Sequence, residues 1–101
     1  MGLFGRKRRG RGQGTGDGAY LLQFAKTRQG VEAFIEAPAE GGKPTVVLVD
    51  ADGVWTRRRV PNAQMVRKFG TQLGLPVHDV DTTGYPDRMQ ATSVDDVARP
   101  S

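Results

Sequence analysis

Continuous and alternating runs of hydrophobic residues divide the middle of the chain into predicted strands. Residues 46–49 (VVLV) form an apolar, mostly β-branched run, which is typical of a strand buried on at least one face. Residues 50–53 (DADG) suit a type I turn followed by a left-handed residue, a conformation that glycine adopts without steric cost. Residues 54–60 predict a returning strand, which Pro61 ends because proline has no N–H to donate to a sheet. The pattern therefore predicts a β-hairpin over residues 45–60.

The two faces of this hairpin differ in polarity. If Gly53 forms a bulge, Asp50 lies opposite Val54, and directly opposed residues share a face. One face then carries Val46, Leu48, Val54, Thr56, Arg58 and Val60, and the other carries Thr45, Val47, Val49, Trp55, Arg57 and Arg59. Burying an unpaired ion costs several kcal/mol, so we expect the first face, with its single arginine, to meet the core. A register slip of one residue would reverse this assignment.

Two periodic segments precede the hairpin. Residues 19–29 predict a helix with Asp17 as its N-cap and Gly30 at its end. Residues 31–37 alternate between two faces, as a strand does. The apolar helix stripe holds Tyr20, Leu21, Phe24 and Ala25, one strand face holds Val31, Ala33 and Ile35, and the other holds Glu32, Phe34 and Glu36. We expect the helix stripe to pack in the core.

Two further segments follow the hairpin. Asn62 is expected to cap a helix over residues 63–73 that Gly74 closes. One side of that helix carries Met65, Val66, Phe69 and Leu73. Residues 76–80 predict a short strand at a sheet edge, where proline and charge are tolerated. The order α-β-β-β-α-β predicts a two-layer α+β domain, with two helices on a small antiparallel sheet.

Composition sets the predicted domain boundaries. The first 18 residues combine glycines with a basic cluster, and such a segment buries too little apolar surface to offset the entropy of ordering it. We therefore expect a disordered basic arm over residues 1–18, one domain over 19–81 and a flexible tail over 82–101. The net charge of +4 lies chiefly in the arm, which weakens the case for polyanion binding by the domain itself.

Residue content excludes several chemistries. The chain has no cysteine, which excludes disulfides, thiolate zinc sites and cysteine nucleophiles. On a strand the single histidine, His78, points away from Asp79 and Asp81, so the three cannot converge on a metal. No apolar run is long enough to span a membrane, and no signal peptide is evident. We expect a cytoplasmic, non-enzymatic protein without a cofactor or metal.

The second face of the predicted sheet is a candidate binding surface. An apolar centre rimmed by both glutamate and arginine is more typical of a protein contact than of a nucleic-acid platform. The residues expected to bind a protein partner, or a second copy of the chain, are Phe34, Val47, Val49, Trp55, Arg57 and Arg59. Alternatively, the first helix covers this face and no site exists there. Our leading hypothesis is an accessory domain that binds a protein partner or itself.

Electrostatic binding of RNA or DNA is the second hypothesis. Basic side chains neutralise phosphates, and such binding weakens steeply as salt rises. The residues expected to contact nucleic acid are Arg6, Lys7, Arg8, Arg9, Arg11, Arg58, Arg67 and Lys68, aided by Arg57 and Arg59. The arm could instead contact an anionic membrane weakly or only improve solubility.

Two resemblances accompany these patterns. The α-β-β-β-α order over residues 19–73 is similar to that of double-stranded RNA-binding domains, a family in which lysines at the start of the second helix grip phosphates. Here Asn62 and Gln64 stand at that place, and Arg67 and Lys68 follow a turn later. The segments GVEAFIE, VVLVDADGVWTRRRV and LGLPVHDV with GYPDRM resemble a family of short, basic proteins of high-GC Gram-positive bacteria without an assigned activity. That resemblance implies one compact domain with variable ends and no catalytic residues.

Overall fold

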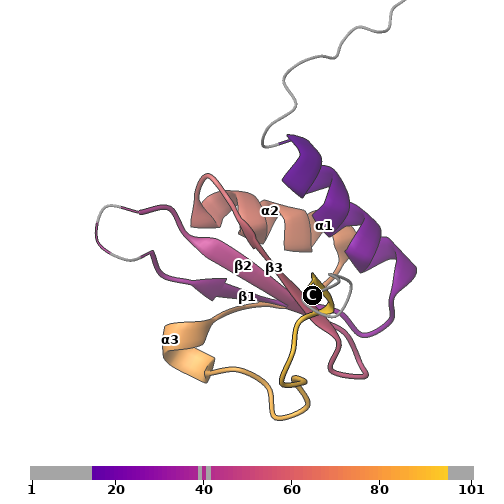
Figure 1. The fold of residues 1–101 in the computed structure, drawn as a ribbon. Coiled ribbons are helices and arrows are strands. Elements are labelled where there is room, and N and C mark those ends of the chain that lie inside the picture. Colours follow the sequence, from indigo (N-terminus) through magenta and orange to yellow (C-terminus); the bar gives the residue numbers. More distant parts are fainter. Residues whose placement is uncertain (1–14, 39, 41, 96–101) are drawn as a thin grey trace, which may run out of the picture.

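The computed structural model describes residues 15–95 apart from 39 and 41, and arranges them as helices packed against a four-stranded sheet (Figure 1). The elements in chain order are α1 (Thr15–Thr27), β1 (Glu32–Glu36), β2 (Thr45–Val49), β3 (Trp55–Arg59), α2 (Ala63–Leu73), β4 (Val77–Asp79) and α3 (Val80–Thr83). The predicted α+β class is confirmed. The short helix α3 is an addition to the predicted order.

The sheet is mixed rather than antiparallel throughout. Its strand order is β3-β2-β1-β4, and the β1–β2 and β2–β3 pairs are antiparallel. β4 runs parallel to β1, with His78 opposite Phe34. Parallel strands need a crossover connection, and α2 supplies it by carrying the chain from β3 at one edge to β4 at the other. The predicted edge position of the last strand is confirmed, and the predicted antiparallel pairing is corrected for this strand.

The central hairpin forms in the predicted register. Val49 lies opposite Trp55, and the other pairs of β2 and β3 follow in step. The Asp50 N–H donates to the Val54 carbonyl at 2.9 Å, and the Asp50 carboxylate accepts from the Val54 N–H at 2.9 Å. Gly53 has a φ of +89°, the left-handed conformation that the turn requires. These bonds fix the turn and, through it, which side chains share a face.

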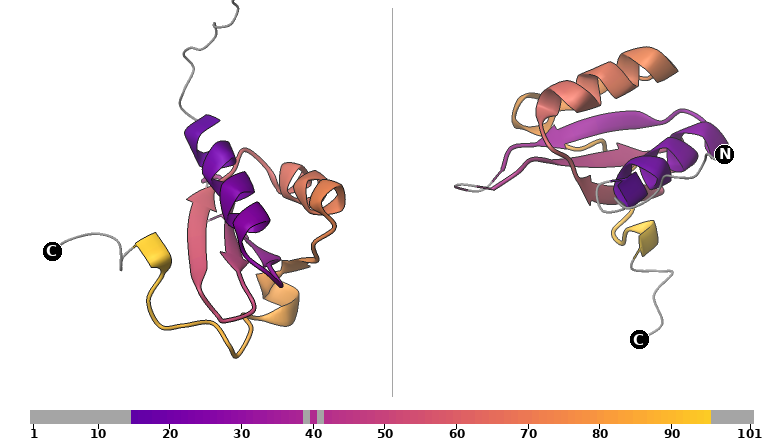
Figure 2. Two further views of the ribbon diagram at one scale, coloured as in Figure 1. Left: turned by 90° about the vertical axis from the view of Figure 1, so that its right-hand side faces the viewer. Right: turned by 90° about the horizontal axis from the view of Figure 1, so that it is seen from above.

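The hairpin face predicted to be buried does meet the main core. Both α1 and α2 lie on this side of the sheet, beside each other (Figure 2). The buried residues of this cluster are Leu21, Phe24, Val31, Ala33, Ile35, Val46, Leu48, Val60 and Val66. Arg58, the one arginine of this face, reaches the carboxylates of Asp17 and Asp95 beyond the apolar residues. Its charge is therefore paired rather than buried alone.

The ends of the two long helices follow local signals. Asn62 caps α2 by accepting a backbone N–H at 2.9 Å, and Gly74 closes the helix in the left-handed conformation, as predicted. α1 begins at Thr15, earlier than predicted, so Asp17 lies in its first turn rather than at its N-cap. The Asp17 carboxylate pairs there with Arg58, at 3.4 Å.

The second face of the sheet is covered by the chain that follows β4 (Figure 1). Its four apolar residues, each at most 8% exposed, are Phe34, Val47, Val49 and Trp55. Val80 and Met89 pack onto them, and the Gln90 carbonyl accepts the indole N–H of Trp55, so part of the predicted tail continues over this face. Val94 and Asp95 lie on the other side of the sheet, where Val94 packs on the main core and Asp95 accepts from Thr56 and Arg58. The expected open face is therefore wrong, as is the alternative in which the first helix covers it. Isolated apolar residues after β4, rather than a helix stripe, provide the cover.

Candidate protein-binding groove

Arg57 was expected to be a rim charge of a binding surface. It instead belongs to a cluster of polar side chains that attaches the chain after β4 to the sheet. Its guanidinium donates to both carboxylate oxygens of Glu36, at 2.8 and 2.9 Å, and lies 5.1 Å from the centroid of the Trp55 ring. The Tyr85 hydroxyl also donates to Glu36. Burial would raise the pKa of Glu36, but hydrogen bonds from Arg57, Thr45 and Tyr85 outweigh it and lower that pKa. This cluster fastens the segment after β4 to the sheet.

Two arginines expected to contact nucleic acid are also committed to carboxylates. Arg58 donates to both oxygens of Asp95, at 2.9 and 3.1 Å, and Arg67 donates to Asp79 at 3.0 Å. The guanidinium of Arg58 also lies 4.1 Å from the ring centroid of Tyr20. A paired guanidinium must give up its carboxylate to hold a phosphate. The arm residues predicted with them, Arg6, Lys7, Arg8, Arg9 and Arg11, lie outside the described residues.

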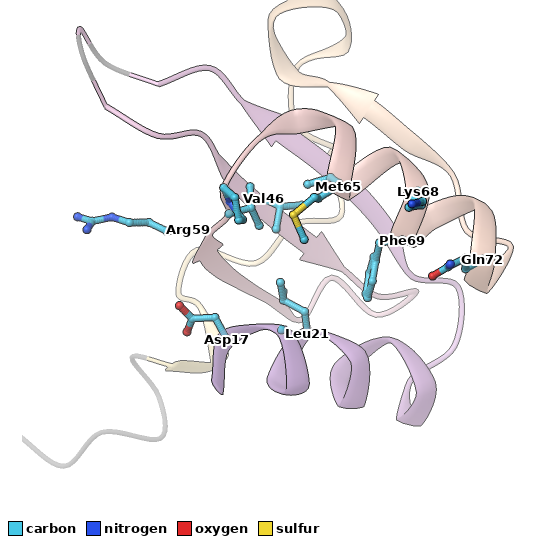
Figure 3. A pocket seen from close by; sticks show the side chains of 12 residues that line it. Asp17, Leu21, Val46, Arg59, Met65, Lys68, Phe69 and Gln72 are labelled. Carbon is cyan, nitrogen blue, oxygen red and sulfur yellow. The ribbon is translucent and has the colours of Figure 1, made fainter. Parts of the chain in front are cut away.

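Arg59 and Lys68 differ from the other predicted site residues. Both side chains are exposed, and neither makes an ion pair or hydrogen bond with any residue that the structure describes. Arg59 ends β3 and Lys68 lies on α2, yet both border the same depression (Figure 3). The fold thus brings together one residue predicted for protein binding and one predicted for nucleic-acid binding.

This depression is an apolar groove of about 550 Å³ between α1 and α2, here called the α1–α2 groove. Leu21 points from α1 toward α2, while Met65 and Phe69 point from α2 toward α1 (Figure 3). The buried side chains of Val46 and Val60 also line it. Its charged and amide side chains are Asp17, Arg59, Lys68 and Gln72. The interior is therefore apolar and the polar groups stand at the edges.

α2 forms one wall because its apolar stripe is wider than the surface that the sheet can cover. Val66 and Gly70 are buried, whereas Met65 is 52% exposed. Neighbouring residues of a helix point about 100° apart, so Met65 and Phe69 turn toward α1 when Val66 packs on the sheet. Gly70 permits this close packing, since a Cβ atom there would lie 2.3 Å from a methyl group of Val77.

The interpretation from sequence assigns Leu21, Met65 and Phe69 to apolar helix stripes that pack in the core. Leu21 is buried and Phe69 packs against the core, as predicted, and the exposure of Met65 is what the interpretation misses. The available signal is the adjacent apolar pair of Met65 and Val66, which widens the stripe beyond one helix face. Only the spacing of α1 and α2 shows which of the two residues the core accepts.

The surroundings of His78 agree with its predicted structural role. Its Nε2 atom lies 2.8 Å from Oε1 of Glu32, and its ring stacks on Phe34 with 4.9 Å between centroids. Within residues 15–38, 40 and 42–95, no group of three histidine or carboxylate side chains is placed to hold a metal ion. In the same part of the chain, no helix combines the length and hydrophobicity needed to cross a membrane.

Comparison with known proteins identifies no relative: no family model matches the chain, and no curated protein or solved structure matches it significantly. The two resemblances noted from the sequence stay predictions. A function for this chain must therefore be inferred from its own residues, and the α1–α2 groove is our candidate site.

Proposed function

We propose that this chain is a non-enzymatic interaction domain that binds an apolar segment of a protein partner in the α1–α2 groove. The observation that carries the proposal is the exposure of Met65, 52%, beside Leu21 and Phe69 in a groove of about 550 Å³. Each Å² of apolar surface removed from water contributes about 25 cal/mol, so an occupant that covers the exposed part of Met65 would gain binding free energy. Methionine also adapts its shape to different partners.

The distribution of polar groups favours a protein segment over a small molecule. Small-molecule sites place a few polar groups so that they converge on the ligand inside a largely apolar cavity. In the α1–α2 groove, Arg59, Lys68 and Gln72 are exposed at the edges, and the Asp17 carboxylate already pairs with Arg58. An apolar interior with a polar rim is instead the usual anatomy of a protein interface.

Other surfaces of the sheet are less available. The second face is covered, and its Trp55 is 8% exposed. β3 is an edge strand, but the Asp95 carboxylate accepts from the Arg57 N–H, and Arg58 donates to the Arg57 carbonyl at 2.9 Å. Addition of a partner strand at this edge would have to displace both bonds. The groove requires no such displacement.

Nucleic-acid binding stays a prediction for the basic arm. Between residues 15 and 95 the chain has nine basic and ten acidic residues, so the folded part has no excess of positive charge to steer a polyanion. Arg58 and Arg67, predicted for that role, hold carboxylates. The geometry of the described residues therefore supports the protein-binding proposal better.

Site-specific photocrosslinking tests the proposal. A benzoylphenylalanine at position 65 should yield a covalent adduct with the partner in a lysate of the source organism. The matched control places the same group at Leu22, which is 40% exposed but does not line the groove. Equal adducts from both positions, or none from position 65, would contradict the proposal. An adduct of twice the chain mass would identify a second copy as the partner.

A further inference from the structure

The rim of the α1–α2 groove carries positive charge that no described residue neutralises. Arg59 and Lys68 both line the groove, are exposed, and make no ion pair among the described residues. The one acidic side chain of the lining, Asp17, is already paired with Arg58. An occupant with carboxylates beside its apolar surface would complement this rim, whereas a basic occupant would meet like charge.

The interior turns of the two helices that wall the groove offer no backbone partner to an occupant. α1 and α2 satisfy their interior N–H and C=O groups within each helix, and Val46 and Val60 contribute side chains rather than a strand edge to the lining. An extended peptide would gain no ladder of hydrogen bonds there. A helix brings its own backbone bonds with it and needs only side-chain contacts.

The spacing of the wall residues suits a helix of a few turns. Met65, Phe69 and Gln72 stand at i, i+4 and i+7 on α2 and so form one row along the groove. The row extends over about 10 Å at the rise of 1.5 Å per residue. Two to three turns of a partner helix would cover it. In Figure 3 Arg59 lies toward one end of the groove and Lys68 toward the other, so acidic residues are needed at both ends of the apolar stripe.

Two occupants supplied by the chain itself fit less well. Residues 1–14 hold five basic residues and no acidic residue, so the arm would add positive charge to a positive rim. A two-fold dimer through the groove would place Arg59 and Lys68 of one copy near those of the other, because such an interface pairs the same patch. Both arrangements bring like charges together.

Resting on the proposed function, we infer that the occupant of the α1–α2 groove is an amphipathic helix of a partner protein, with acidic residues flanking its apolar stripe. The apolar stripe packs against Leu21, Met65 and Phe69. The flanking carboxylates pair with Arg59 and Lys68. This is helix-in-groove recognition with a defined charge preference.

Designed peptides test the inference on the full chain. The probe is an 18-residue peptide that forms an amphipathic helix. Leucines every three or four residues form its apolar stripe, and glutamates flank that stripe. Its matched control replaces every glutamate with lysine. By fluorescence anisotropy, the acidic peptide should bind at least ten-fold more tightly than the basic one. The R59E/K68E double variant should reverse this preference, while Leu22→Glu, outside the groove, should leave it unchanged.

A third peptide, with the same residues and a central proline, tests the helical form. It should bind at least ten-fold more weakly than the acidic peptide, because proline breaks the helix. Equal affinity of the acidic and basic peptides, no binding of either, an unreversed preference in the double variant, or full affinity of the proline peptide would overturn the inference. A position-65 adduct with a native partner would still support the proposed function, so the two failures are distinguishable.

Discussion

The indole N–H of Trp55 donates a hydrogen bond to the backbone carbonyl of Gln90 at 2.7 Å. The two residues are 35 positions apart, and the bond ties the chain after β4 to the second face of the sheet. Trp55 is thus a structural residue of the domain rather than an exposed anchor. Binding at the α1–α2 groove, on the opposite face, therefore depends on it only through stability.

Replacing Trp55 should destabilise the fold. Trp55→Phe leaves the Gln90 carbonyl without its donor, at a cost of about 1–3 kcal/mol in the free energy of unfolding. Trp55→Ala also removes a buried ring and should cost about 3–5 kcal/mol. Urea unfolding followed by far-UV circular dichroism measures both. A Trp55→Ala variant as stable as the wild type would show that the indole is not packed as described.

Removing the cover should expose the second apolar face. A chain ending at residue 83 loses Met89, the Tyr85 bond to Glu36 and the Gln90 acceptor, so it should bind the dye ANS and unfold at a lower temperature. The matched control ends at residue 95 and keeps these contacts. Equal dye binding by both shortened chains would contradict the packing of this segment.

The sequence predicts the hairpin and α2 closely because local chemistry determines them. Asp50 and Gly53 specify the turn, and Asn62 and Gly74 specify the ends of α2. The cover of the second face has no such signal. Met89 is an isolated apolar residue in a stretch without periodicity, and long-range hydrogen bonds of its neighbours Arg88 and Gln90 hold it in place.

Local sequence patterns likewise do not predict the groove, although they identify its apolar residues. Met65 and Val66 are both apolar, and only the packing of α2 against the sheet and α1 makes Val66 3% and Met65 52% exposed. The pairing of Arg57 with Glu36 and of Arg58 with Asp95 also joins distant segments. Those pairs occupy two predicted binding cations, whereas Arg59 makes no ion pair within the described residues.

Acid should destabilise the domain through Glu36 and Asp95. Burial raises the pKa values of these two carboxyls, but hydrogen bonds from Arg57 to Glu36 and from Arg58 to Asp95 outweigh it. Both pKa values therefore lie below the usual 4.5 and 3.8. A carboxyl with a lowered folded-state pKa contributes stability above its unfolded pKa and loses it as pH falls through the folded value. The melting temperature should therefore decrease as the pH is lowered from about 4.5.

Glu36→Gln and Asp95→Asn should each flatten that acid dependence, since the titrating group is gone. Asp87→Asn, at an exposed position without an ion pair among the described residues, is the control and should keep the wild-type profile. Melting temperatures from pH 2 to 7, by circular dichroism, measure the slopes. Identical slopes in all four proteins would refute the assigned roles.

Two glycines of the helices should respond to alanine in opposite directions. A Cβ atom at Gly70 would lie 2.3 Å from a Val77 methyl group and 3.0 Å from the Leu75 carbonyl oxygen, so Gly70→Ala should lower the free energy of unfolding by about 1–3 kcal/mol. A Cβ atom at Gly18 would meet no atom within 4 Å, so Gly18→Ala should raise it by up to about 1 kcal/mol through helix propensity. Chemical denaturation measures the free energy of unfolding of both variants. A Gly70→Ala variant more stable than the wild type would contradict the packing of α2.

Filling the groove tests the central claim most directly. Gly18 lies in the lining with open space beside it, so Gly18→Phe places a ring where the partner would bind without disturbing the core. Leu22→Phe adds the same ring outside the groove. The measurement is the affinity of the partner captured at position 65 for the wild type and for each variant. A loss of ten-fold or more with Gly18→Phe and none with Leu22→Phe is the predicted result. Unchanged affinity of a folded Gly18→Phe protein would contradict it.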